Sequence, residues 1–273
     1  MGTFDHLTFL ELEWGANPHY RREVRYGLRS LLADIPDTRP VIYTDTPGAY
    51  GPEAAAARIV NISDDLPAFT NGWTYHFRAK VCVLLHALRS FGGGCVLMDS
   101  DSFIRPGFAA AMNEALKHGA VMNFLTFQDP FPDFAGFTVE LPHAGTYRYD
   151  PGNAPVFNSG LIAVTEAHIP AIEDALELID AWRPATAHLR KDQEQFAVGE
   201  ALRIHGVPIG TNRTEFMHYC NTWARKYMRW RFSRMPGLDT APLVPAPPHI
   251  VVRKSISRAY KACALLGILP LDL

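Results

Sequence analysis

Apolar residues alternate along the chain between short continuous runs and longer stretches in which they recur every three or four positions. Residues 95–98 form a continuous apolar run, which predicts a strand buried on both faces of a sheet. Residues 76–91 carry apolar side chains at helical spacing and form the clearest predicted helix. Three glycines, residues 92–94, follow and are expected to end this helix in a turn.

The same alternation continues through most of the chain. The expected strands are 6–12, 41–43, 95–98, 120–126 and 160–164, and the expected helices are 20–32, 76–91, 107–118, 171–182 and 193–205. The segment 54–62 fits either structure. Strands and helices in this order favour a three-layer α/β/α fold with a mostly parallel central sheet. After Gly206 the periodicity fades, so we expect one α/β domain over residues 1–255 and a C-terminal extension over residues 256–273.

The composition excludes several classes of protein. Apolar residues make up 48% of the 273 residues and charged residues 20%, which supports a sizeable core and rules out a disordered chain. No apolar run approaches the roughly 18 residues that a membrane-spanning helix needs. The four cysteines lack CxxC spacing, so we expect reduced thiols of a cytoplasmic protein and no zinc site built on them.

The net charge of −2 hides an uneven distribution. Residues 212–263 contain ten basic and two acidic residues, a formal +8, so the remainder of the chain carries −10. Such a segment suits a diphosphate substrate, an anionic membrane or nucleic acid, and the near-neutral total makes nucleic acid the least expected. Residues 257–268 also fit a short amphipathic helix. We therefore expect peripheral contact with an anionic membrane, with packing of the tail on the acidic body as the alternative.

Asp99 and Asp101 are the sharpest candidates for chemistry. They directly follow the buried run 96–98, and open α/β sheets bind ligands at the carboxyl ends of their strands. Two carboxylates there repel each other unless a divalent cation neutralises them. The pattern favours Mg²⁺ or Mn²⁺ bound between these residues and substrate phosphates, with an exposed acidic turn as the alternative. No glycine-rich phosphate loop occurs, so a diphosphate would need metal and basic side chains.

Several motifs resemble those of the GT-A fold glycosyltransferases, and in particular the retaining family 8 enzymes that use nucleotide-sugar donors. Residues 96–103 are similar to the strand and DxD motif of that fold, and residues 157–162 to the FNSG motif of family 8. Asp192-Gln193 resembles the DQ pair that follows. Residues 78–80 resemble the basic start of the helix before the DxD strand, and residues 20–45 the first βαβ unit. These motifs imply a fold and a donor class, but neither a sugar nor an acceptor.

The resemblance also implies a set of site residues. Asp99 and Asp101 would bind the metal and the donor diphosphate, with Ser100 between them. The family ends its catalytic region with a His-Tyr-x-Gly…Lys-Pro-Trp motif whose His is the third metal ligand. Its best match here is His249, without that Gly or Trp, and His218-Tyr219 is the alternative. The other implied contacts are of Asn158 with the donor sugar, Asp192 with the sugar or diphosphate, Lys254 with the diphosphate, Arg78 or Lys80 with phosphate, Asp45 with the nucleoside and Tyr43 with the base.

Each of these contacts has a structural alternative. Asn158 and Asp45 could build turns, Asp192 could cap a helix, and Tyr43 could lie in the core. The two basic residues of the segment 78–80 could be solvated charges on a helix.

The expected function is metal-dependent transfer of a sugar from a nucleotide-diphosphate sugar, with UDP the expected nucleotide, to a saccharide or glycolipid acceptor. Retention is favoured, because the leaving phosphate can then take the acceptor proton. Inversion would require a carboxylate base such as Asp192 or Glu194. Two other classes stay open. A nucleotidyltransferase would usually carry a glycine-rich loop near its N-terminus, which residues 10–17 lack, and a basic module would bind nucleic acid or membrane through the C-terminal segment.

Overall fold

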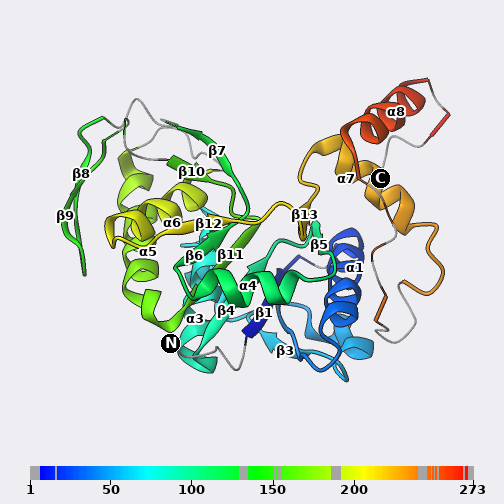
Figure 1. Ribbon diagram of the computed structural model, residues 1–273, viewed down its shortest axis with the longest axis horizontal. Helices are drawn as coiled ribbons and strands as arrows, with labels where there is room; N and C mark the ends of the chain where they lie inside the picture. Colours follow the sequence, from blue (N-terminus) through cyan, green and yellow to red (C-terminus); the bar gives the residue numbers. More distant parts are fainter. Residues whose placement is uncertain are drawn as a thin grey trace.

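A seven-stranded sheet forms the centre of the computed structural model, which describes residues 7–15, 17–128, 135–150, 152, 155–185, 192–238, 245–246, 248, 250, 252–266 and 268–269 (Figure 1). The strand order is β12-β6-β11-β4-β1-β2-β3. Strand β11 runs antiparallel to both of its neighbours, and the other neighbouring pairs are parallel. The bounds are β1 (Leu7–Glu13), β2 (Val41–Thr44), β3 (Arg58–Asn61), β4 (Gly94–Met98), β6 (Ala120–Met122), β11 (Leu161–Thr165) and β12 (Ile209–Thr211).

Alternate side chains of the central strands enter two separate cores. Cys95 and Leu97 of β4 pack with α3 (Arg78–Phe91), α5 (Ile169–Ala185) and α6 (Gln193–Ile204). Val96 and Met98 pack instead with α1 (Pro18–Asp34) and α4 (Phe108–Leu116). Because successive side chains of a strand point to opposite faces, helices cover both faces of the sheet. The predicted three-layer α/β/α fold with a mostly parallel sheet is confirmed.

The helix ends follow local signals. Helix α1 begins after Asn17, whose side-chain oxygen accepts a hydrogen bond from the His19 backbone N–H at 2.9 Å. Helix α3 ends at Gly92, which has a φ of 67°, a left-handed value that a residue without a Cβ adopts freely. Gly92 and Gly93 therefore form the predicted turn after the helix, whereas Gly94 already begins β4.

Among the described residues, shorter elements form three two-stranded sheets apart from the central sheet. Antiparallel pairs form between β5 (Ser102–Ile104) and β13 (Phe216–His218), β7 (Leu125–Gln128) and β10 (Pro155–Phe157), and β8 (Thr138–Leu141) and β9 (Gly145–Arg148). A short helix, α2 (Leu66–Phe69), and 3-10 helices at Pro47–Glu53 and Glu166–His168 complete these connections. The single strand expected over 120–126 is wrong. The chain leaves the central sheet after β6 and pairs with β10, through a hydrogen bond from Asn158 N to the Phe124 carbonyl at 2.7 Å.

The basic C-terminal segment packs on the body of the protein. Helices α7 (Thr222–Phe232) and α8 (Lys254–Leu265) lie together at one end of the molecule, beside α1 (Figure 1). A third core joins them, in which Tyr26 of α1 lies 4.9 Å from Phe232 between ring centroids, and Tyr260 of α8 packs against Tyr227. Tyr260 and Ala264 of α8 are thus buried in this core, whereas Leu265 at the end of the helix is exposed. No helix within the described ranges has the length and apolar character to cross a bilayer.

Candidate functional site

Strand pairing brings three potential metal ligands together. Asp99, Ser100 and Asp101 follow β4 directly, and the backbone N–H of Asp99 donates to the Gly160 carbonyl at 2.9 Å. The chain then enters β5, whose antiparallel partner β13 places His218 opposite Ser102. This short ladder therefore carries an imidazole from more than a hundred residues away to the two carboxylates.

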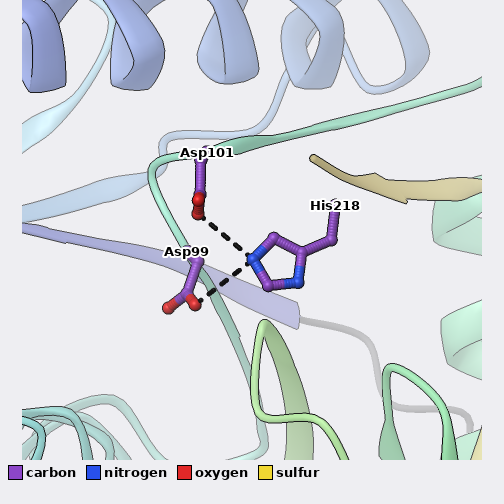
Figure 2. A group of neighbouring side chains, drawn as sticks. All are labelled: Asp99, Asp101 and His218. Atoms are coloured by element: carbon purple, nitrogen blue, oxygen red, sulfur yellow. Dashed lines mark hydrogen bonds and ion pairs between the residues drawn. The ribbon is translucent and has the colours of Figure 1, made fainter. Parts of the chain in front are cut away.

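Figure 2 shows the resulting triad, with both carboxylates directed at the same ring nitrogen. His218 Nε2 lies 3.2 Å from Asp101 Oδ1 and 3.6 Å from Asp99 Oδ2. One ligand atom from each of the three residues lies within 4.8 Å of the others. This spacing suits a single ion bound between them.

Asn158 fixes the orientation of the His218 ring. Its Oδ1 lies 2.9 Å from His218 Nδ1 and also accepts the Gly160 backbone N–H at 3.0 Å. Asn123 Nδ2 lies 3.2 Å from the same Nδ1, so the two amides together hold this side of the ring, and the Asn158 oxygen, which can only accept, pairs with a hydrogen on Nδ1. Nε2, on the other side of the ring, faces the two carboxylates and is the nitrogen available to a metal once it is deprotonated.

Gly160 makes room for the same ring. A Cβ at this position would lie 2.2 Å from His218 Nδ1 and 2.4 Å from its Cε1, much closer than real contacts allow. The Asn-Ser-Gly sequence thus has a physical explanation: the amide orients the imidazole, and the glycine lets it approach the loop.

Two cations approach the carboxylates from different elements. Lys80 of α3 places Nζ 2.6 Å from Asp99 Oδ1. Arg225 of α7 places Nη1 3.2 Å from Asp101 Oδ2, and its other guanidinium nitrogens bind Glu23 at 3.0 and 2.6 Å. Because Glu23 is fully buried, this two-point contact holds the Arg225 side chain against the site.

These contacts set the ionisation of the triad without a metal. Burial favours the neutral form of Asp101, but the hydrogen bond and charge of His218, with Arg225 and Lys80, lower its pKa to about 2. Burial likewise disfavours the charged form of His218, yet Asp101 and Asp99 raise the pKa of its imidazole to about 10. The negative charge of the two aspartates therefore attracts a cation strongly, whether it comes from side chains or from a metal.

A third carboxylate, Glu194, lies beneath the site. It is buried in the first turn of α6, contacts the Ser159 hydroxyl and lies 3.5 Å from Lys80 Nζ. Burial raises the pKa of Glu194, and the Lys80 charge opposes that rise. Lys80 therefore bridges Glu194 and Asp99.

A cavity of about 340 Å³ opens beside the two aspartates. Lys80 and Arg225 line it, together with the end of β1 and four ring-bearing side chains. The rings belong to Trp14, Tyr20, His76 and Phe77. Trp14 and His76 lie with ring centroids 6.3 Å apart and an interplanar angle of 32°. The cavity thus combines carboxylates, cations and flat apolar surfaces.

The donor set fits a divalent metal. Two carboxylates supply the hard oxygens that Mg²⁺ and Mn²⁺ prefer, and the converging ligand atoms leave further coordination positions on the cavity side. Lys80 occupies one Asp99 oxygen, Oδ1, whereas His218 faces the other, Oδ2, so the lysine and an ion can share this carboxylate.

The structure places only part of the sequence-derived set in this cavity. Asp99, Ser100, Asp101 and Lys80 line it. The Asn158 side chain lies next to the triad and contacts His218. Its contact with the donor sugar stays a prediction. Asp192 lies at the start of α6, next to Gln193, and is not among the described residues that line the cavity.

Three other expected contacts lie elsewhere in the described structure. Tyr43 is fully buried in the core, and its hydroxyl bonds His86 Nδ1 at 2.8 Å. Arg78 forms a two-point ion pair with Asp180 at 2.8 Å, which ties α3 to α5. Asp45 accepts the Gly15 backbone N–H at 3.1 Å, so it shapes the loop after β1 without lining the cavity itself.

Two expected residues cannot be placed. His249 lies outside the described residues, and so does the side chain of Lys254, whose backbone begins α8. Arg225, which the sequence motifs did not single out, lines the cavity beside Asp101. The His218-Tyr219 pair matched the first two residues of the family motif and so identified His218 as an alternative metal ligand. Only the general basic charge of its segment pointed to Arg225.

Comparison with known proteins rests on structure alone, because no protein-family model and no curated protein matches the chain. The galactosyltransferase LgtC in complex with donor and acceptor sugar analogues superposes with a TM-score of 0.56 at 12% identity, covering 89% of this chain and 98% of LgtC. An active-site mutant of LgtC gives 0.53 at 12% identity over 85% and 94%. Mouse xyloside xylosyltransferase 1 gives 0.49 at 13% identity over 76% and 84%. The chain has the fold of the GT-A glycosyltransferases.

Proposed function

We propose that this protein is a metal-dependent glycosyltransferase that moves a sugar from a nucleotide-diphosphate sugar to an acceptor hydroxyl. The observation that carries the proposal is the Asp99, Asp101 and His218 triad at the wall of a cavity that also holds two cations and several rings. A metal held by carboxylates, together with two cationic side chains, suits a diphosphate. Ring faces suit a nucleoside base. We take the metal to be Mn²⁺, because an imidazole ligand favours a transition metal over Mg²⁺. We take the donor to be a UDP-sugar, as expected from the sequence motifs.

In the proposed reaction the acceptor oxygen forms a bond to the anomeric carbon as the bond from that carbon to the diphosphate oxygen breaks. The electron pair stays on the diphosphate, and the acceptor proton passes to the same leaving oxygen. A bound metal would stabilise the charge that grows there. Arg225, held by Glu23, would add a second positive charge, and Lys80 would keep Asp99 and Glu194 in place.

Retention of configuration is part of the proposal. An inverting enzyme needs a carboxylate that is free to take the acceptor proton. Glu194 is buried and engaged by Ser159 and Lys80, which argues against that role.

Incubation of the purified protein with a panel of nucleotide sugars, with and without Mn²⁺, tests the function. Slow, metal-dependent release of free sugar and nucleoside diphosphate is expected from one donor. Exchange of pyrophosphate into the nucleotide sugar would instead identify a nucleotidyltransferase, and no reaction with any donor would contradict the proposal.

Trp14→Ala is expected to raise the KM for the donor at least about tenfold with little change in kcat, because one base–aromatic stack contributes about 1–3 kcal/mol. Trp14 lines the cavity beside His76. Steady-state donor hydrolysis measures the effect, and Trp230→Ala is the matched control, since that side chain belongs to α7, packs against Tyr260 and does not line the cavity. An equal change in both variants would remove Trp14 from the donor site.

We also propose that the protein acts in the cytoplasm and docks on an anionic membrane through the end of α8. Leu265, Leu266 and Ile268 are 64, 74 and 68% exposed, next to basic residues of the same helix. The four cysteines are all free, which suits a reducing compartment.

Phosphatidylglycerol-containing vesicles are expected to bind the protein at low salt and to release it near physiological salt, because each surface cation contributes about 1 kcal/mol and is screened. Cosedimentation measures binding, with pure phosphatidylcholine vesicles as the control. Leu265→Ser with Leu266→Ser should weaken it. Docking is excluded if the full-length protein ignores anionic vesicles even at low salt.

A further inference from the structure

A second cavity, of about 640 Å³, borders the metal triad on its other side. His218 lines it, while Asp99 and Asp101 line the first cavity, and the two cavities share no lining residue. The second cavity extends from β13 past the start of α7 to the first turns of α8. A molecule in this space would meet the proposed donor site at His218.

The walls of the second cavity carry one sign of charge. Arg253, Arg258 and Lys261 line it, and no acidic residue does so among the residues described. The ion pairs of the described chain include none of these three cations. Lys80 and Arg225 of the first cavity, by contrast, are each bound to carboxylates. Within the part of the chain that the structure describes, the second cavity therefore presents positive charge without a paired carboxylate, which favours an anionic ligand.

An aromatic surface lies beside these cations. Trp223 lines the cavity, and the ammonium groups of Lys226 and Lys261 lie 5.8 and 5.4 Å from its ring centroid. Phe124 lines the same space, with the Arg213 guanidinium 4.6 Å from its ring. Flat rings and amide or hydroxyl groups, here Asn221 and Ser257, suit a sugar ring with its hydroxyls.

On the basis of the proposed transferase function, we propose that the second cavity is the acceptor site and that the acceptor is a saccharide bearing a phosphate group. The phosphate lies among Arg253, Arg258 and Lys261, and the hydroxyl that attacks the donor points to the His218 end. Phosphate fits better than a single carboxylate, because its three oxygens can engage arginine forks and an ammonium at once. A soluble and a lipid-linked sugar phosphate share this chemistry, and the phosphate contacts are the same for both.

Titration calorimetry on the full-length protein with UDP and Mn²⁺ present tests the assignment. The probes are glucose, glucose 6-phosphate and inorganic phosphate. Glucose 6-phosphate is expected to bind at least about tenfold more tightly than glucose, since a charge-assisted hydrogen bond contributes about 1.5–3 kcal/mol. Arg258→Gln with Lys261→Gln should abolish that preference. Arg231→Gln with Arg234→Gln removes the same charge near α7, outside the cavity, and should preserve it.

Equal affinity for glucose and glucose 6-phosphate in the unmodified protein would overturn the assignment, and so would an equal loss in both double variants. Inorganic phosphate that binds as tightly as glucose 6-phosphate would reveal an anion site without a sugar contact and would also overturn it. A lipid-linked glucose phosphate in detergent micelles distinguishes the source: tighter binding than glucose 6-phosphate identifies a lipid-linked acceptor, and equal binding a soluble one. Donor hydrolysis, measured separately, reports on the proposed function, so the two can fail independently.

Discussion

Asp101→Ala is expected to lower turnover of the nucleotide-sugar donor at least about 100-fold, the scale of losing one major electrostatic stabiliser of a transition state. Asp101 is 5% exposed and contacts both His218 and Arg225, so its loss removes a proposed metal ligand and frees two cations inside the site. The nearly isosteric Asp101→Asn and Asp99→Asn should also weaken Mn²⁺-dependent binding of UDP. Calorimetry with and without Mn²⁺ measures that coupling.

Asp64→Asn is the matched control, since Asp64 is exposed and does not line the cavity. Thermal unfolding of each variant separates loss of chemistry from loss of fold. If UDP binds the unmodified protein equally well with and without Mn²⁺, the two aspartates do not serve a metal–diphosphate site.

The part of the site that could be predicted from the sequence is the part encoded locally. A buried apolar run followed at once by two acidic residues specifies a strand and a polar strand end, and the strand end of an open sheet is where ligands bind. The nine consecutive residues 95–103 are sufficient to predict that Asp99, Ser100 and Asp101 belong to the site. The alternation of faces within β4 likewise suffices to predict a sheet covered on both sides.

The sequence motifs locate residues along the chain but do not show which way each side chain points. Arg78 and Lys80 are two positions apart on α3, and two positions of a helix differ by about 200°, so they face nearly opposite ways. Lys80 reaches Asp99, while Arg78 reaches Asp180. Tyr43 lies in the core because its position in β2 points to the α3 face, where His86 meets its hydroxyl.

The other residues of the site are brought there by contacts between distant parts of the chain. The apolar periodicity of the sequence cannot predict such contacts. His218 arrives through a three-residue strand in a region where the helical and strand patterns have faded. Arg225 is one of ten basic residues in its segment, and the residue that positions it, Glu23, lies 202 positions away. Only the tertiary contact distinguishes this arginine from its neighbours.

His218→Ala is expected to lower the affinity for Mn²⁺ at least about tenfold and to remove most metal-dependent turnover, because the third side chain of the triad is lost. His249→Ala should leave the affinity unchanged, which separates the two histidines that the sequence offered. Manganese electron paramagnetic resonance, which reports free Mn²⁺ directly, measures the affinity in the presence of UDP.

Two further variants test the position of the imidazole without removing it. Asn158→Ala deletes the acceptor at Nδ1, and Gly160→Ala places a methyl group within 2.2 Å of the same atom. Both should weaken Mn²⁺ binding by about 10–100-fold, the cost typical of losing the group that orients a ligating histidine. Ser63→Ala is the matched control and should bind Mn²⁺ normally, because Ser63 is exposed and its hydroxyl bonds Asn61 and Asp45 and no residue of the triad. If His249→Ala abolishes Mn²⁺ binding while His218→Ala, Asn158→Ala and Gly160→Ala retain it, then His249 is the ligand. The His218 contacts would in that case hold together the loop between β10 and β11 without binding the metal.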